Sequence, residues 1–495
     1  MKSDTAKKAI IIGSGIAGIA VAIRLAVKGY SVEIFEANDY PGGKLAEIRN
    51  NGFRFDAGPS LLTMPQYIDE LFQLVGKDPS AYFNYQKLDV ICKYFYEDGT
   101  RVTAYADEQK FTHELTSKTT VSTKSISIHI NYSQKIYTLT YKIFLESPLR
   151  IFRNLFKWDG LKTLFRLPGI DAMRTMHKAN ESFFGDVRIV QFFDRYATYN
   201  GSNPYQAPAT LNVIPHLEQH FGAYFPEGGM YSIIHSLVRM VVELGVKIHY
   251  NSPVDAIVLD GKKAKGVKVK GQIHEADIVI SNADLWPTYK KLLKNYPHIH
   301  PKKTLQQEHS SSALIFYWGI SKQLEQLDLH NIFFSADYKA EFDHIWQQKT
   351  IYTDPTIYIN ISSKLNPTDA PDGCENWFVM INAPANEGQD WDDIIGVCRE
   401  NILAKLSRLL GENIRQYIVY ENVLDPRGIE TKTSSYQGSI YGTSSNNRYA
   451  AFLRHPNRSP KIKNLYFCGG SVHPGGGIPL CLLSAKIVSE LVPKV

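Results

Sequence analysis

A glycine-rich turn between two short apolar runs near the N-terminus is the feature that most constrains the fold. Gly13, Gly15 and Gly18 stand at G-x-G-x-x-G spacing. In a strand–turn–helix unit such glycines permit a tight turn, close approach of the backbone to a pyrophosphate and close helix–strand packing. The start of the helix also offers unpaired N–H groups to phosphate. The apolar periodicity predicts a strand at 9–13, a helix at 16–28 and a second strand at 30–35.

Glu36 directly follows the second predicted strand, where an acidic residue can bind the ribose hydroxyls of a dinucleotide. A carboxylate at this place disfavours a ribose 2′-phosphate, which leaves FAD or NAD as the cofactor. The lysines and apolar residues at the N-terminus also resemble a signal peptide. The glycine spacing and the second strand favour a dinucleotide site instead.

Two further glycine turns decide between these cofactors. Residues 36–44 read EANDYPGGK and residues 55–60 read FDAGPS. Together with the first turn, they resemble the start of the FAD-dependent amine-oxidase-like superfamily, in which the GG(R/K) segment lies against the flavin pyrophosphate. The resemblance implies FAD, and ordinary turn chemistry is the alternative explanation of these glycines.

The C-terminal region carries the most specific motif. Residues 467–479 read FCGGSVHPGGGIP and separate a strand pattern from a helical one. This loop resembles the G-x-x-x-H-P-G-x-G-x-P signature of the bacterial-type phytoene desaturase family of FAD-dependent carotenoid desaturases. Residues 196–204 and 224–230 match segments of the same family. The resemblance therefore covers nearly the whole chain, and it leans toward the hydroxycarotenoid 3,4-desaturase group.

This resemblance implies an α/β fold: a Rossmann-like FAD-binding domain of the amine-oxidase-like superfamily, an inserted α+β substrate domain and a helical membrane-facing segment. A turn signal at Asp98 and Gly99 predicts a hairpin where the substrate domain begins. Residues 111–141 stay open between a strand, a poorly formed helix and a disordered segment, because the family carries a helix there whereas Ser-Ile-Ser-Ile-His-Ile alternates like a strand. An amphipathic helix is expected over 228–245. The predicted boundaries are 1–85, 228–285 and 455–495 for the FAD-binding domain, 86–110 and 286–454 for the substrate domain, and 111–227 for the helical segment.

The residues expected to hold FAD belong to the three glycine turns, to the acidic strand end and to the C-terminal loop, with one position that in the family contacts the adenine through its backbone. They are Gly13, Ser14, Gly15, Ile16, Ala17, Gly18, Glu36, Ala37, Gly42, Gly43, Lys44, Gly58, Pro59, Ser60, Val254, Gly470 and Ile478.

Desaturation of an unactivated C–C bond removes a hydride, which no side chain can accept, so a flavin has to take it. The sequence offers Asp159 and His473 as candidates for the base that removes the accompanying proton. A histidine before Pro-Gly is typical of a structural role, and an aspartate in Trp-Asp-Gly is typical of a turn or an N-cap. Asp194 and Arg195 have weaker claims. No catalytic base is assigned.

A basic and aromatic segment, residues 149–174, predicts a membrane partner. It holds six Lys or Arg and two Asp, a balance of +4, interleaved with bulky apolar residues. This mixture suits the surface of an anionic bilayer, where a carotenoid substrate dissolves. The alternative is an amphipathic helix that packs inward. We expect a peripheral protein on the cytoplasmic, inner face of the membrane.

Charge and cysteine usage exclude other partners. The net charge of +6 is small for 495 residues and disfavours nucleic acid. The five cysteines are scattered without a CxxC pair, which favours a reducing compartment and predicts no metal site. The final electron acceptor, quinone or oxygen, stays open.

Four other functions share parts of this pattern. A phytoene or diapophytoene desaturase and a redox-neutral carotenoid isomerase would carry the same motifs. An amine or porphyrinogen oxidase is disfavoured by the His-Pro-Gly-Gly-Gly loop. A prenyl-lipid escort on the same scaffold, which is no enzyme, is opposed by the intact glycines and Glu36.

Overall fold

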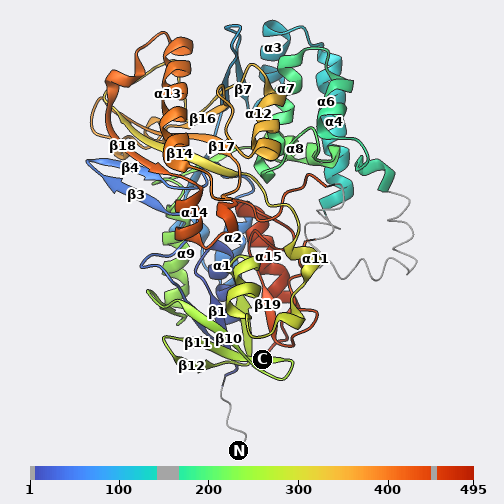
Figure 1. Ribbon diagram of the computed structural model, residues 1–495, viewed down its shortest axis with the longest axis vertical. Helices are drawn as coiled ribbons and strands as arrows, with labels where there is room; N and C mark the ends of the chain where they lie inside the picture. The colour runs from blue at the N-terminus through green and yellow to red at the C-terminus, as the bar shows by residue number, and fades with distance from the viewer. Residues whose placement is uncertain (1–5, 142–166, 448–453) are drawn as a thin grey trace, which may run out of the picture.

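The computed structural model describes residues 6–141, 167–447 and 454–495. Two sheets organise the molecule, one in each half (Figure 1). The lower half contains a five-stranded sheet and the upper half a seven-stranded sheet. The chain passes between the halves several times, so each sheet combines strands that lie far apart in the sequence.

The five-stranded sheet has the order β19-β13-β1-β2-β9, and its neighbouring strands are all parallel. Because both faces of a parallel sheet are covered, its strands are short apolar runs rather than alternating ones. The observed bounds lie within two residues of the predicted ones for the first two strands. The strands are β1 (Lys8–Ile12), β2 (Ser31–Phe35), β9 (Lys247–His249), β13 (Ile278–Ser281) and β19 (Leu465–Phe467).

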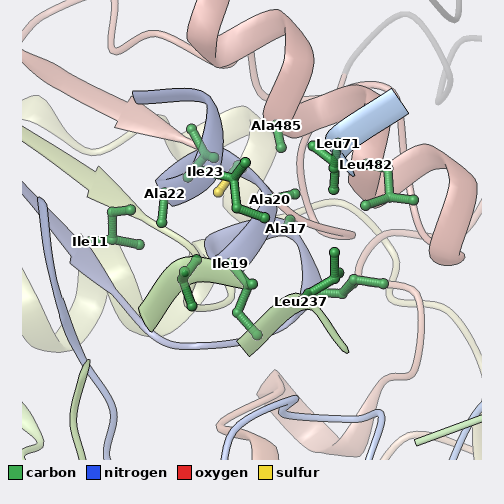
Figure 2. Packing of buried hydrophobic residues seen from close by; sticks show 14 of the residues in the cluster. Ile11, Ala17, Ile19, Ala20, Ala22, Ile23, Leu71, Leu237, Leu482 and Ala485 are labelled. Carbon is green, nitrogen blue, oxygen red and sulfur yellow. The ribbon is translucent and has the colours of Figure 1, made fainter. Parts of the chain in front are cut away.

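Helix α1 (Ile16–Val27) lies in the centre of the lower core. Figure 2 shows its side chains among Ile11 of β1, Leu71 of α2, Leu237 of α9 and Leu482 of α15. A helix that is covered on all sides has to be apolar all round, and this explains the sequence IAGIAVAIRLAV. The surrounding helices are α2 (Gln66–Leu74), α9 (Ser232–Glu243) and α15 (Ile478–Leu491).

The helix predicted over 228–245 begins later than expected, at Ser232. Gly228 and Gly229 have φ values of 78° and 86°, which a right-handed helix does not allow. The two glycines instead form the turn that leads into α9.

The seven-stranded sheet has the order β18-β14-β17-β16-β15-β6-β7. The hairpin predicted around Asp98 and Gly99 is confirmed, since β6 and β7 pair antiparallel across that turn. Helix α13 (Trp391–Leu410) packs against the sheet in one apolar cluster. The strands are β6 (Val90–Phe95), β7 (Arg101–Tyr105), β14 (Ser312–Ile320), β15 (His330–Phe333), β16 (Ile357–Asn360), β17 (Glu375–Ala383) and β18 (Ile418–Leu424).

The segment that the sequence left open between helix and strand is helical. In α4 (Thr123–Thr140), the Ser122 side chain accepts the Ser125 N–H and caps the first turn. The buried residues recur every three or four positions, as on one face of a helix. Tertiary packing thus overrides the strand-like local alternation. The helices of this layer are α3 (Glu108–Lys118), α4, α6 (Met176–Phe183), α7 (Val187–Asp194) and α8 (Val213–Phe221).

Smaller elements complete the fold. The predicted helical segment 111–227 also contains a strand, β8, which pairs with β5. No helix in the part of the chain that the structure describes is both long and apolar enough to span a bilayer. These elements are β3 (Glu47–Asn50), β4 (Phe53–Asp56), β5 (Tyr85–Lys87), β8 (Tyr224–Pro226), β10 (Val254–Asp260), β11 (Lys263–Val269), β12 (Gln272–Glu275), α10 (Leu285–Pro287), α11 (Lys302–Leu305), α12 (Tyr338–Asp343) and α14 (Pro426–Thr433).

The buried His129 on α4 makes the stability depend on pH. It lies among the rings of Tyr132, Phe184 and Phe193, and burial lowers its pKa to about 4. An unfolded histidine takes up a proton below a pH of about 6.5. The folded state does so only near its lower pKa, so the free energy of unfolding falls as the pH drops from about 6.5 to about 4.

Replacing His129 with phenylalanine is expected to reduce that dependence by up to about 1.4 kcal/mol per pH unit. Urea unfolding at several pH values in this range measures the slope. The exposed His113 provides the matched control, and His113→Phe is expected to leave the slope unchanged. An unaltered slope in the His129→Phe protein would contradict this assignment.

Candidate active site

A cavity of about 1260 Å³ lies between the two sheets. Gly13 and Glu36 line it from the lower half, and His330, Tyr358 and Met380 line it from the seven-stranded sheet. Pockets for one drug-sized ligand span about 300–1,000 Å³. The cavity therefore has room for a cofactor and a second molecule.

The start of α1 forms one wall of this cavity. Gly15 is the N-cap residue with an extended backbone, and Ile16 and Ala17 of the first turn line the cavity. The positive end of the helix dipole and its first N–H groups are thus placed at the wall. This arrangement fits the pyrophosphate of a dinucleotide.

Glu36 is buried at the end of β2 beside that wall. One carboxylate oxygen accepts the N–H and the hydroxyl of Ser14, both at 2.7 Å. The other oxygen accepts the Asn38 N–H at 2.9 Å. These three donors fix the carboxylate where the sequence predicts the ribose hydroxyls.

The structure brings nearly all the predicted cofactor residues to the same cavity. Ser14 and Gly18 are the exceptions, because neither lines it. Ser14 orients Glu36, and Gly18 lies against the turn: a Cβ there would be 2.3 Å from the Gly13 carbonyl oxygen. The lining residues are Gly13, Gly15, Ile16, Ala17, Glu36, Ala37, Gly42, Gly43, Lys44, Gly58, Pro59, Ser60, Val254, Gly470 and Ile478.

Lys44 crosses from the second glycine turn toward the C-terminal part of the chain. Its ammonium donates to the carbonyl oxygens of Ser439 and Ile440 at 3.0 and 2.8 Å. Burial lowers the pKa of Lys44, and the carboxylate of Asp284 opposes that shift. The lysine thus holds the cavity wall together and places a positive charge there.

Sequence reasoning missed Asn282, which joins the first turn to the last strand. Its Oδ1 accepts the Gly18 N–H at 3.1 Å, and its Nδ2 donates to the Cys468 carbonyl at 3.2 Å. Asn282 directly follows β13, at the carboxyl end of the parallel sheet, where ligands of such sheets bind. That position is the signal that could have identified it.

A second missed residue, Arg454, has a buried guanidinium in the cavity wall. The guanidinium donates to neutral oxygens of Asn200, Thr443 and Gly470, each at 3.3 Å. Burial lowers its pKa to about 10. Such a cation suits an anionic group of a bound cofactor, and no local motif in the sequence distinguishes it.

The structure describes one of the two candidate bases, His473, but not the other, Asp159. His473 is buried, lines the cavity, donates its N–H to the His455 carbonyl at 3.0 Å and precedes a cis bond to Pro474. Asp159, with most of the basic segment 149–174, lies outside the described residues. Neither residue is thereby assigned as a base.

Asp194 does not line the cavity. It is buried, and it accepts hydrogen bonds from His177 Nδ1 at 2.6 Å and Asn180 Nδ2 at 2.8 Å. Burial raises its pKa. Arg195, next in sequence, does line the cavity. The sequence therefore could not rank these two neighbours.

The upper part of the cavity is mainly apolar. Side chains from β6, β15 and β17 face it together with side chains from α8, and a few polar groups interrupt them. Such a wall suits a long hydrocarbon. Its apolar members include Ile91, Ile214, Leu217, Ile332, Phe378 and Met380.

Comparison with known proteins agrees with this geometry. The family described as flavin containing amine oxidoreductase matches residues 16–493, nearly the whole chain. The chain belongs to this family. It is accordingly an FAD-dependent oxidoreductase, and the cofactor predicted from the glycine turns is confirmed.

Two curated relatives narrow the group within the family. The chain is 50% identical to a 1-hydroxycarotenoid 3,4-desaturase of Flavobacterium sp., over 98% of this chain and 99% of the relative. It is 34% identical to a 4,4'-diapolycopene oxygenase of Methylomonas sp., over 99% of each. The predicted membership of the carotenoid desaturase family is confirmed.

Solved structures show the same fold at low sequence identity. An oxidoreductase from Methanosarcina mazei aligns with a TM-score of 0.66 and 17% identity, over 98% of this chain and 100% of that one. A cyclohexylamine oxidase from Brevibacterium oxydans aligns with a TM-score of 0.60 and 14% identity, over 98% and 99%. These similarities support the amine-oxidase-like fold.

Proposed function

We propose that this chain introduces a C–C double bond at the 3,4 position of a 1-hydroxycarotenoid. The observation that carries the proposal is one cavity that joins the dinucleotide end at Gly15 and Glu36 to an apolar wall. The 50% identity to the Flavobacterium desaturase over nearly both chains supports the same reaction and substrate.

The reaction removes two hydrogen atoms from adjacent carbons. Bound FAD would accept one hydrogen together with two electrons as a hydride, and the other hydrogen would leave as a proton to a base. We propose that the cavity-lining glycines and Glu36 hold the nucleotide part, and that the loop at Gly470 and Ile478 lies at the flavin. The chain's own contribution is to orient the polyene along the apolar wall and to exclude water.

Expression in bacteria that make acyclic, monocyclic and hydroxylated carotenoids tests this function. We expect a product of the hydroxylated carotenoid that lacks two hydrogen atoms and absorbs at longer wavelength. A change of retention at constant mass would show isomerisation instead. No change in any carotenoid, with the flavin bound, would reject the proposal.

We also propose that the protein docks on the inner face of the membrane through residues 149–174. Replacing Arg150, Arg153 and Lys157 with glutamate is expected to weaken binding to anionic vesicles by about tenfold or more, because each such charge contributes about 1 kcal/mol. Co-sedimentation with phosphatidylglycerol vesicles measures this binding.

The matched control reverses three exposed charges elsewhere. Lys262, Lys265 and Lys268 lie on or beside β11. Their replacement by glutamate is expected to leave vesicle binding within about twofold, since they do not belong to the proposed docking segment. Equal losses in the two triple variants would reject the proposed docking segment.

A further inference from the structure

A chain of hydrogen bonds runs from a predicted cofactor residue into the seven-stranded sheet. The Ser60 hydroxyl lies 2.7 Å from the Tyr358 hydroxyl, which lies 2.7 Å from His330 Nδ1. All three residues line the large cavity. The chain therefore connects the third glycine turn with the wall at β15 and β16.

The neighbouring Asn360 determines which nitrogen of His330 carries the proton. Asn360 Nδ2 donates to the Leu329 carbonyl at 3.1 Å and to His330 Nδ1 at 3.2 Å. Because an amide nitrogen can only donate, Nδ1 is an acceptor, and Asn360 and the closer Tyr358 hydroxyl share its single lone pair. Burial lowers the pKa of His330 to about 3, so the ring is neutral. The single ring proton then resides on Nε2.

This Nε2–H lacks an acceptor. Among the residues that the structure describes, His330 Nε2 is buried and has no hydrogen-bond partner. The His330 side chain as a whole is 3% exposed. A buried donor without an acceptor is unfavourable, and a bound ligand can supply the missing acceptor. A ligand oxygen in the cavity is the acceptor that this geometry lacks.

A second unused donor lines the same cavity. Arg195 Nη1 donates to the Tyr199 hydroxyl and Nη2 donates to the Tyr94 hydroxyl, at 2.7 and 2.6 Å. Its Nε is buried and has no partner in the described part of the chain. Tyr94 lies on β6, which pairs with β15, the strand that carries His330, so both donors belong to the same side of the cavity.

The charge of Arg195 is already balanced. Glu218 lies 3.6 Å from it, and both carboxylate oxygens of Glu218 accept tyrosine hydroxyls, from Tyr196 and Tyr199. Because His330 is neutral and Arg195 is paired, the two donors suit an uncharged oxygen. A carboxylate or phosphate would bring an unbalanced charge into a buried site.

We propose that His330, assisted by Arg195, binds the hydroxyl oxygen at the end of the carotenoid substrate. This inference rests on the proposed function and names the residues that select its hydroxylated substrate. The position of the reacting bond agrees with this assignment. In a 1-hydroxy end group only C1 and C2 separate the oxygen from C3, so the hydroxyl has to lie close to the flavin. Ser60, where the hydrogen-bond chain starts, belongs to a turn predicted to hold FAD.

The test compares two polyenes that differ only in the end hydroxyl. In the FAD-loaded protein, His330→Leu is expected to lower kcat/KM for the hydroxylated polyene about tenfold and to change kcat/KM for the deoxy polyene less than about twofold. Quenching of tryptophan fluorescence by the polyene measures Kd without turnover, and we expect the same ratio there. His330→Gln, which retains an N–H donor, is expected to restore part of the preference.

A matched control replaces another buried histidine, and His129→Leu is expected to leave the ratio of the two substrates unchanged, since His129 does not line the cavity. Equal losses for both polyenes in His330→Leu, or an unchanged ratio, would overturn the inference. Failure of the unmodified protein to desaturate either polyene would instead overturn the proposed function. A selective loss in Kd would even then support the binding role of His330.

Discussion

A Gly15→Val protein is expected to fold and to be nearly colourless after purification. We expect its flavin content to fall to below about a tenth of that of the unmodified protein, since a steric clash that costs about 1.4 kcal/mol or more reduces affinity by tenfold or more. Absorbance of the flavin relative to that of the protein measures the loss.

The expected loss has a local steric cause. A Cβ at Gly15 would lie 2.7 Å from Asn282 Oδ1. On another side, the second glycine turn packs against this residue: a Cβ at Gly43 would be in van der Waals contact with the Gly15 Cα, at 3.6 Å. The valine methyl groups would therefore displace Asn282 or occupy the space beside the helix N-terminus that the pyrophosphate needs.

Introducing valine at a glycine far from the predicted cofactor residues in the sequence controls for general effects of this substitution. Gly396 is exposed on α13, and a Cβ there meets nothing within 4 Å. Gly396→Val is expected to retain its flavin. A Gly15→Val protein with the flavin content and spectrum of the unmodified protein would show that Gly15 does not contact the cofactor.

The second large effect concerns stability. Replacing Arg54 with leucine is expected to lower the free energy of unfolding by about 3–5 kcal/mol, the typical cost of removing one partner from a buried ion pair. The urea dependence of unfolding of the FAD-loaded protein measures this change.

Arg54 on β4 is the cation of a buried cluster. Its guanidinium contacts Asp56 at 2.5 Å, Asp369 at 3.1 Å and Glu47 at 3.0 Å. Asp56 also accepts the N–H groups of Met230 and Tyr231 at the turn before α9. The cluster thus connects β4 with two distant segments of the chain.

Without the Arg54 guanidinium, the carboxylates of Asp56 and Asp369 stay buried and lose their cationic partner. Burial already raises the pKa of Asp369, and loss of Arg54 is expected to raise it further. A carboxyl whose folded pKa exceeds its unfolded value takes up protons more readily when folded, so the deficit of the variant should shrink as the pH falls toward about 4. A deficit that is constant with pH would contradict this explanation.

Arg49 on the adjacent strand β3 provides the control. Its side chain is 66% exposed and pairs with Glu47 at 3.0 Å. Arg49→Leu is expected to cost less than about 1 kcal/mol, because solvent screens an exposed pair. Similar losses in the two leucine variants would show that the buried cluster has no special role.

The local pattern of the sequence determined the dinucleotide unit. Gly13, Gly15 and Gly18 can be read directly because a tight turn and a close backbone approach require glycine at fixed spacing. Glu36 follows from the length of the unit. These requirements act over a few residues, so composition and periodicity reveal them, together with the hairpin at Asp98 and Gly99.

Other features depended on contacts between distant segments. The alternation in residues 125–130 resembled a strand locally, yet burial of one face of α4 against other helices made this segment helical. Ser14 stays a predicted cofactor residue, and its hydroxyl donates to Glu36, a contact that the local pattern does not reveal. Local preferences differ by less than the free energy of burying a face, so tertiary packing decided them.

The polar groups of the cavity illustrate the same division most clearly. Sequence patterns predicted a flavin and a lipophilic substrate, because the glycine turns and the family motif are short stretches of consecutive residues. Ser60, Tyr358 and His330 come from three segments, and Arg195 from a fourth. His330 Nε2 lacks a hydrogen-bond partner because folding buries the ring and places donors around Nδ1. No local sequence pattern predicts this arrangement, since its members come from distant segments.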